Sequence, residues 1–294
     1  MIVDKVANVY CIDTMINNEK DAVCCYIINS EKACIVDCGS TSTASEILNA
    51  INELGISRDD VRYIAVTHIH LDHGGGAGRL LKYFKNAKVL VHPKGFKHLI
   101  NPLKLWNAAK SLLGDIAEIY QAPEPCEESK ILAVKDMQTI DLGDCKLMAL
   151  HTPGHAVHHV SFYLSKHKTL FTGDSAGMQY NGMIVPTTPP PFDFNESLKS
   201  LEKMMELNPE IIAFTHFGFG KSELLKKVYK KIVEWVDIAK EVVSKGGDAM
   251  DLQDKILELD SEFRELLNLY KNSRIVKESY MLGFLGLIEY VKGG

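Results

Sequence analysis

The sequence predicts an α/β body followed by a helical tail. Segments with the spacing of strands alternate with segments at helical spacing through roughly the first 220 of the 294 residues. From residue 221 onward, apolar side chains recur at helical spacing alone. A composition of 46% hydrophobic and 24% charged residues is that of an ordinary globular protein. We therefore predict a body at residues 1–220, with an insertion at 93–135, and a helical region at 221–294.

Strands are expected to dominate residues 1–38. Residues 22–28 and 33–36 are apolar and rich in β-branched side chains, and the polar residues 29–32 between them are typical of a turn. Residues 42–54 carry apolar side chains at helical spacing, which predicts a helix. Further strands are expected at residues 61–66, 89–92, 138–142, 146–150, 160–164, 169–171 and 211–214, and further helices around residues 80–84 and at 195–207.

The insertion at residues 93–135 interrupts this alternation. It is rich in proline and large apolar side chains, namely Pro93, Phe96, Leu99, Pro102, Leu103, Trp106, Leu112, Pro123 and Pro125. These apolar side chains either cap the core or form a wall above the site that selects an acyl or alkyl group. We interpret the insertion as a lid beside the functional site.

Charge and hydropathy exclude several classes of protein. There are 33 Lys and Arg against 38 Asp and Glu, a net charge of -5, so the broad basic surface of a nucleic-acid binder is not expected. The longest apolar run, residues 281–288, is far shorter than the ~20 residues of a membrane-spanning helix. The first residues lack the pattern of a signal peptide. We expect a cytoplasmic protein with a small-molecule substrate, and a homodimer stays an open alternative.

All eleven histidines lie between His68 and His216, and four metal-ligand residues occur in His68-x-His70-x-Asp72-His73. In extended backbone, residues i and i+2 point to the same side, so His68 and His70 can hold one ion. A turn into a helix, eased by the glycines at 74–76, re-aims Asp72 and His73 towards a second ion. Imidazole and carboxylate suit zinc, and also ferrous iron or manganese. The alternative is a surface histidine cluster beside a glycine loop.

Three more candidate ligands, His155, Asp174 and His216, each follow an expected strand and turn. Strand ends at one edge of a sheet are where loops converge into a site. The other histidines, His92, His98, His151 and His167, are expected to be structural or surface groups. Tyr180 and residues 178–183 are expected either to line a pocket or to belong to the core. The seven cysteines are expected to be small buried hydrophobes.

These motifs resemble those of the metallo-β-lactamase-fold hydrolases over residues 1–220. Asp37 in Val-Asp-Cys-Gly looks like the first motif, residues 67–73 resemble the signature Thr-His-x-His-x-Asp-His, and His155 in Pro-Gly-His resembles the third. Asp174 in Thr-Gly-Asp and His216 are similar to the last two motifs. The resemblance implies an αββα sandwich with a C-terminal helical extension. His158 stands where the family has glycine, and His159 resembles the last histidine of that run.

The resemblance also implies roles for these residues. His68, His70 and His155 would hold one divalent metal ion, with zinc expected first and iron or manganese as alternatives. The second ion would be held by Asp72, His73 and His216, with Asp174 shared between the two. A hydroxide bridging the ions would attack a small ester, thioester or lactone. Asp72 would orient this nucleophile and pass a proton to the leaving group, and Asp37 would support the histidines.

Other reactions of the same superfamily stay open. A mononuclear-iron sulfur dioxygenase uses nearly the same ligands, phosphodiester hydrolysis is a further alternative, and a non-catalytic metal-stabilised module is the last. Lys271 and Arg274 are candidates by type for binding a glutathione carboxylate, although neither aligns with a family motif. The helical region is expected to cover the metal-site face through three apolar stripes, at residues 225–242, 252–270 and 280–290.

Overall fold

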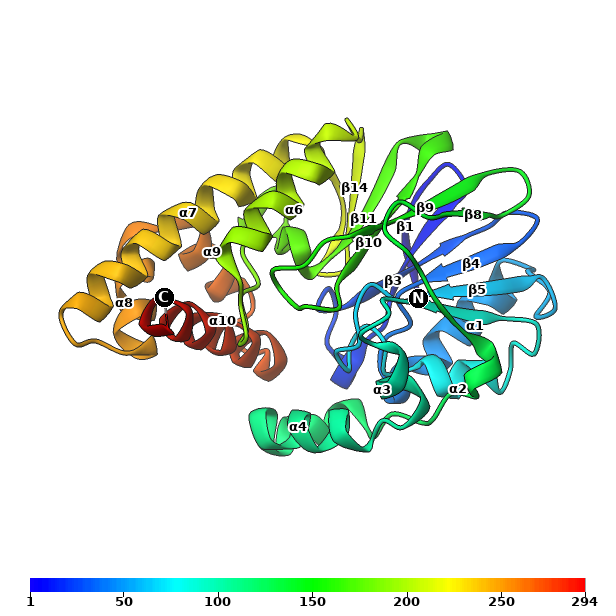
Figure 1. Cartoon of the computed structure of the whole chain (residues 1–294), viewed down its shortest axis with the longest axis horizontal. Coiled ribbons are helices and arrows are strands. Elements are labelled where there is room, and N and C mark those ends of the chain that lie inside the picture. The colour runs from blue at the N-terminus through cyan, green and yellow to red at the C-terminus, as the bar shows by residue number, and fades with distance from the viewer. Residues whose placement is uncertain (294) are drawn as a thin grey trace.

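The computed structural model describes residues 1–293, and in it two β-sheets pack face to face between layers of helices (Figure 1). The helices that flank the first sheet include α1 (Ala44–Glu53) and α2 (Ala77–Leu81). On the far side of the second sheet lie α6 (Phe194–Glu206) and the C-terminal helices. The fold is therefore the αββα sandwich with a C-terminal helical region that the family resemblance implied.

The first sheet has seven strands in the order β1-β2-β3-β4-β5-β6-β7. Its strands are β1 (Ile2–Val6), β2 (Val9–Asp13), β3 (Cys24–Ile28), β4 (Ala33–Val36), β5 (Val61–Ala65), β6 (Lys88–Val91) and β7 (Ile131–Ala133). The pairs from β1 to β4 are antiparallel, and those from β4 to β7 are parallel. β4 and β5 therefore end at the same edge, where the His-rich segment begins.

The second sheet has six strands in the order β15-β14-β11-β10-β9-β8. Its strands are β8 (Thr139–Asp141), β9 (Lys146–His151), β10 (Val160–Leu164), β11 (Thr169–Gly173), β14 (Ile211–Phe214) and β15 (Gly218–Lys221). A separate hairpin, β12 (Met178–Tyr180) with β13 (Met183–Val185), follows β11. β11 and β14 are parallel neighbours, so the loops after both strands start at one edge.

The remaining helices form two groups. The insertion contributes α3 (Phe96–Ile100), α4 (Leu103–Leu113) and α5 (Ala117–Tyr120). The C-terminal group is α7 (Glu223–Ser244), α8 (Ala249–Leu259), α9 (Ser261–Leu269) and α10 (Arg274–Gly293). Among residues 1–293, no helix combines the length and hydropathy that crossing a bilayer requires.

The sandwich is held by apolar side chains on both faces of its sheets. Along β3, Tyr26 points between the sheets towards Phe171, while Ile27 packs on the helical side with α1. Alternate residues of a strand face opposite sides, so a continuous apolar run is expected where both faces are covered. All seven cysteines are buried with free thiols, several of them in these strands.

The insertion and the tail differ in detail from the sequence-based expectation. Residues 131–133, placed in the insertion, form edge strand β7 because buried Ile131 pairs with Val89 of β6. The stripe at 252–270 is two helices, because Asp260 leaves helical geometry and its carboxylate accepts from the amide of Phe263. The hairpin and β15 were not expected. A further apolar cluster joins α6 to the C-terminal helices.

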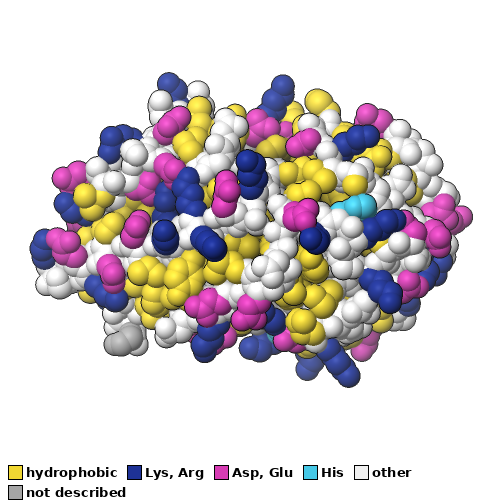
Figure 2. Space-filling view, turned by 90° about the horizontal axis from the view of Figure 1, so that it is seen from above, with side chains coloured by type: hydrophobic (Ala, Val, Ile, Leu, Met, Phe, Trp, Pro, Cys, Tyr) yellow, Lys and Arg dark blue, Asp and Glu magenta, His cyan; other side chains and the backbone are white. Residues whose placement is uncertain are grey.

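The C-terminal helices reach back to the body through α10. The hydroxyl of Thr188 donates to the carbonyl of Gly283 at 2.9 Å, and a Cβ on Gly286 would lie 1.9 Å from the carbonyl oxygen of Thr188. α10 therefore packs tightly on the Pro-rich loop of residues 186–191. On the face seen in Figure 2, Lys and Arg side chains intermingle with Asp and Glu, with hydrophobic patches between them.

Candidate metal centre

The seven candidate ligands are brought together from four separate loops. The segment of residues 68–73 follows β5, and His155 lies between β9 and β10. Asp174 follows β11 directly, and His216 follows β14. Because these strands end on the same side of the sandwich, their loops form one site, as strand-end positions predicted.

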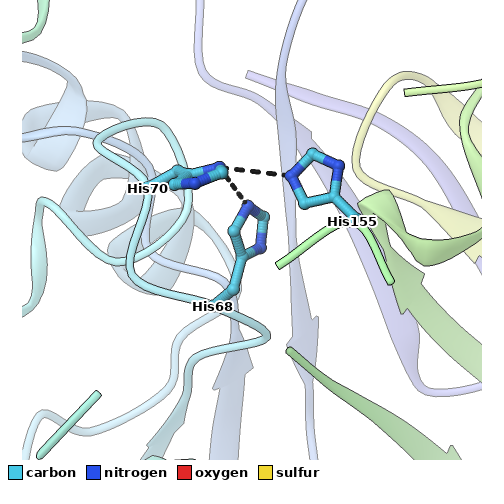
Figure 3. Close-up of side chains that lie close together, drawn as sticks. All are labelled: His68, His70 and His155. Carbon is cyan, nitrogen blue, oxygen red and sulfur yellow. Dashed lines mark hydrogen bonds between the residues drawn. The ribbon is translucent and has the colours of Figure 1, made fainter. Parts of the chain in front are cut away.

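Three histidines converge on one point (Figure 3). Nδ1 of His70 lies 2.9 Å from Nε2 of His68 and 3.2 Å from Nε2 of His155. Nδ1 of His155 contacts the carbonyl of Thr187 at 3.0 Å, so this nitrogen carries the proton and Nε2 is a free lone pair. Nδ1 of His68 likewise contacts the hydroxyl of Thr67 at 3.1 Å, and that hydroxyl is a donor to a carboxylate.

A second group forms beside the first, from Asp72, His73 and His216. Nε2 of His216 lies 3.6 Å from Oδ2 of Asp72, and Nε2 of His73 lies 3.7 Å from the same oxygen. Asp174 lies between the two groups: Oδ1 is 3.2 Å from Nε2 of His73, and Oδ2 is 3.4 Å from Nε2 of His155. Nδ1 of His216 donates to the carbonyl of Ala22 at 2.7 Å, which leaves Nε2 to face the carboxylates.

Asp37 organises the floor of this site from a fully buried position. Its carboxylate accepts from Nδ1 of His73 at 2.8 Å, and from the amide and the hydroxyl of Thr67, both at 2.8 Å. The hydroxyl of Thr215 donates to the same carboxylate at 2.8 Å. These bonds fix the ring of His73 and leave its Nε2 directed at Asp174. Thr215, which immediately precedes His216, was not singled out from the sequence.

Burial and charge set the protonation of the site. Burial, reinforced by the neighbouring histidines, lowers the pKa of His68 well below its ordinary value and that of His70 to about 3. Burial disfavours the protonated form of His73 as well. The carboxylates of Asp174, Asp72 and Asp37 outweigh this effect and raise the pKa of His73 above its ordinary value. Burial disfavours the charged form of Asp174, yet His73, His216 and His155 hold its pKa well below the ordinary value.

The donor set fits divalent cations. Nε2 of His68 and Nε2 of His155 each present a lone pair towards Nδ1 of His70. These three converging nitrogens therefore carry at most one proton, which is on Nδ1 of His70. Nε2 of His73 and Oδ1 of Asp174 are buried, and although they lie 3.2 Å apart, neither makes a well-directed hydrogen bond in the described chain. Buried polar atoms of this kind are costly unless something pairs with them. A cation at each group would satisfy them, and nitrogen with carboxylate oxygen is a donor set that zinc accepts.

Two other histidines complete the surroundings. Nε2 of His159 accepts from the amide of Asp174 at 3.1 Å, and Nδ1 bonds the hydroxyl of Thr152 at 2.8 Å. Both nitrogens are therefore engaged, and His159 positions Asp174. The ring of His158 stacks parallel to that of His68 with 6.3 Å between centroids, and its buried Nδ1 has no partner within residues 1–293. Burial, then His70, lowers the pKa of His158 to about 3.

A cavity of about 280 Å³ opens above the candidate ligands. Its lining includes groups that sequence reasoning missed, namely Leu71, Leu105, Ala108, Ala109, Leu113, Tyr120, Thr187, Pro189, Pro190, Ser279 and Leu282. Leu112 and Met178 line it as well, but Trp106 and Tyr180 do not. Of the side chains expected to form an apolar wall, Leu112 lines the cavity, whereas Trp106 packs against the adjoining apolar cluster and beside Lys110.

A sequence model of the Metallo-beta-lactamase superfamily matches residues 19–216, about two thirds of the chain and the span that contains all seven candidate ligands. The chain belongs to this superfamily. Its relatives include the metallo-beta-lactamase fold-containing protein ST1585 of Sulfurisphaera tokodaii, 35% identical over 207 residues, which are 69% of this chain and 77% of ST1585.

Solved structures of the superfamily share the fold. The crystal structure of the archaeal ST1585 superposes with a TM-score of 0.68 at 31% identity, over 77% of this chain and 86% of that one. A metallo-beta-lactamase family protein of Thermus thermophilus, TTHA1429, superposes with a TM-score of 0.71 at 18% identity, over 98% of this chain and 94% of that one. The second likeness, one of fold alone, spans the C-terminal helices.

A more distant relative carries a functional name. The hydroxyacylglutathione hydrolase of Francisella tularensis subsp. novicida is 24% identical over 212 residues, which are 72% of this chain and 66% of that protein.

Proposed function

We propose that the chain is a dinuclear metal-dependent hydrolase of a small ester, thioester or lactone. The observation that carries this proposal is the pair of adjoining donor groups joined by Asp174, in which Nε2 of His73 and Oδ1 of Asp174 are buried and make no well-directed hydrogen bond. The hydroxyacylglutathione hydrolase among the relatives supports hydrolysis, and the small cavity above the donors supports a small substrate.

The residues divide into two sites in this proposal. His68, His70 and His155 would hold one cation, and Asp72, His73 and His216 the other, with Asp174 shared. Zinc is the expected ion, with iron or manganese as alternatives. When bound, two divalent cations supply the Lewis acidity that turns water into a nucleophile near neutral pH.

The chain's own groups then act on the substrate. The side chain of Asp72 is partly exposed to the cavity, which lets its carboxylate take the proton of the attacking water and return it to the leaving group. Tyr120 lines the same cavity with its phenol protonated, because burial and then Asp72 raise its pKa. This phenol can donate to an oxygen that gains negative charge. The apolar lining limits the entry of competing water.

The test combines metal analysis with a substrate panel. Protein purified without added metal should contain about two ions per chain and hydrolyse members of a panel of esters, thioesters and lactones. Chelation should abolish this activity, and zinc should restore it. Asp174→Ala should lower metal content and reduce kcat by about a thousandfold, since charge stabilisation worth several kcal/mol is lost.

Asp144→Ala is the matched control, because Asp144 forms a surface ion pair with Lys166 at 2.8 Å and is not a candidate ligand. It should keep both metal content and kcat. If the protein instead contains a single iron per chain and takes up oxygen with a sulfur substrate, its reaction is an oxidation and not a hydrolysis. Full metal content with near-normal turnover in Asp174→Ala would refute the shared-ligand assignment.

A further inference from the structure

The cavity above the metal centre has two walls that come from distant parts of the chain. One wall is α4, at residues 103–113, and the other is the part of α10 around Ser279 and Leu282. In Figure 1, α4 lies apart from both sheets. The floor between the two walls is formed by the candidate metal ligands. A ligand bound over the floor would therefore lie between these two helices.

The face of α4 that lines the cavity is apolar throughout. Its five lining residues repeat at intervals of three and four, which puts them on one side of the helix: Leu105, Ala108, Ala109, Leu112 and Leu113. No residue of α4 is fully buried, and Leu112 is 45% exposed. An apolar face left open beside a cavity is a feature of ligand-binding grooves. The described chain leaves this face incompletely covered, so an apolar ligand would complete it.

The basic groups that line the cavity in the described residues are the candidate-ligand histidines of the floor and His158, whose pKa burial lowers to about 3. Within residues 1–293, neither Lys nor Arg is part of the lining, and its only carboxylates, Asp72 and Asp174, belong to the floor. Lys110 of α4 points elsewhere, towards Glu118 at 3.5 Å. A carboxylate or phosphate on the far end of a substrate would lose its hydration here without gaining a counter-charge, which is unfavourable.

We propose that the substrate carries an uncharged, apolar acyl chain that lies between α4 and α10, with its carbonyl group over the floor. This inference rests on the proposed hydrolase function and narrows its substrate class. A cavity of about 280 Å³ limits the acyl group to a short or medium chain, since it lies at the small end of ligand pockets.

The test uses the full-length, metal-loaded protein and p-nitrophenyl esters with linear acyl chains of increasing length. The value of kcat/KM should rise about fourfold per methylene until the cavity is full. Esters of equal length that end in a carboxylate should be at least about 100-fold poorer substrates. Ala109→Phe should move the preferred length to shorter chains, because the larger side chain fills part of the cavity.

A second variant tests whether the cavity rejects charged acyl chains because it lacks a Lys or Arg side chain. Leu112→Lys should raise kcat/KM for the carboxylate-ended esters relative to the neutral ones, by about fivefold at this half-exposed position. Leu103→Lys is the control on the same helix, because Leu103 is 61% exposed and lies outside the cavity. This control should change neither value.

Failure of the inference can be told apart from failure of the proposed function. If the acetyl ester is hydrolysed but kcat/KM is independent of chain length, or equal for neutral and carboxylate-ended esters, the inference is overturned and the hydrolase function stands. If no ester, thioester or lactone is hydrolysed, the proposed function fails. Calorimetric titration with linear alkyl amides then decides the inference: affinity that rises with chain length supports it, and affinity that does not rise overturns it.

Discussion

Oδ2 of Asp37 lies 2.8 Å from Nδ1 of His73, and this contact is buried beneath the candidate metal centre. The carboxylate also accepts from Thr67 and Thr215, so every group that faces it is a donor. A carboxylate suits this position because it only accepts hydrogen bonds. The neutral amide of asparagine would turn an NH₂ group towards at least one of these donors.

Asp37→Asn should therefore weaken metal binding without touching a ligand. Loss of an outer partner of a metal-binding histidine typically costs 10- to 100-fold in affinity, and we expect a decrease of about that size. Competition with a chromophoric chelator measures the affinity. Asp141→Asn, at an exposed ion pair with Lys32, is the control and should bind metal normally. Unchanged affinity in Asp37→Asn would show that the contact to His73 does not support the metal centre.

The sequence predicted the candidate metal centre because its residues carry local signals. Four candidate ligands form one short motif, and the others directly follow apolar strands, so their convergence could be predicted from strand ends alone. The walls of the cavity carry no such signal. Leu105 and Leu282 line the same cavity, although the whole second sheet lies between their helices in the sequence. The spacing of apolar residues in these two segments predicted helices, but it could not show what each helix face packs against.

The errors in the fold have similar causes. The stripe at 252–270 keeps its helical phase across Asp260, so periodicity alone cannot show that the chain bends there. Asp260 is fixed by contacts from α7, in which Lys231 and Nε1 of Trp235 both bond its carboxylate. β15 has the sequence Gly-Phe-Gly-Lys, which has few β-branched residues, and it is a strand because it pairs with β14.

Gly286→Ala should show that α10 supports the metal centre. The added Cβ would lie 1.9 Å from the carbonyl oxygen of Thr188, so the loop beside it has to move. The neighbouring carbonyl of Thr187 holds Nδ1 of His155 at 3.0 Å. We expect metal affinity to fall about tenfold as the ring of His155 loses this support.

Gly293→Ala provides the comparison for this variant, because a Cβ at that position of α10 meets nothing within 4 Å. Its metal affinity should equal that of the unmodified chain. Thermal unfolding of the metal-free proteins separates a loss of overall stability from a local effect. If Gly286→Ala is destabilised but binds metal normally once folded, α10 does not position His155.

We expect the titration of His92 to lower the stability of the metal-free protein in mild acid. Burial, then His151 and Lys94, lowers the pKa of His92 to about 4, against about 6.5 in an unfolded chain. Between these values the unfolded state binds a proton that the folded state does not, so the free energy of unfolding falls as the pH is lowered from about 6.5 to 4. Chemical denaturation in the presence of a chelator measures this fall.

His92→Asn removes the titration but keeps an acceptor for the amide of Lys94, which donates to Nδ1 of His92 at 3.0 Å. The loss of stability between pH 6.5 and 4 should be smaller in this variant. His167→Asn, in the turn between β10 and β11, should keep the slope of the unmodified chain. Identical slopes in all three proteins would mean that His92 titrates alike in the folded and unfolded states.

Tyr120 should contribute to the rate of the reaction rather than to binding. Its side chain is 5% exposed and lines the cavity beside Asp72 and Asp174, so its protonated phenol can donate to a developing oxyanion. Removal of one such donor typically costs 100- to 1,000-fold in kcat, and we expect a loss of about 10- to 100-fold for a single neutral phenol beside two cations. Tyr120→Phe keeps the ring, so KM and metal content should change little. Tyr83→Phe, at a surface position 40% exposed, should leave kcat unchanged. If Tyr120→Phe instead raises KM at constant kcat, Tyr120 is part of the cavity wall and takes no part in stabilising charge.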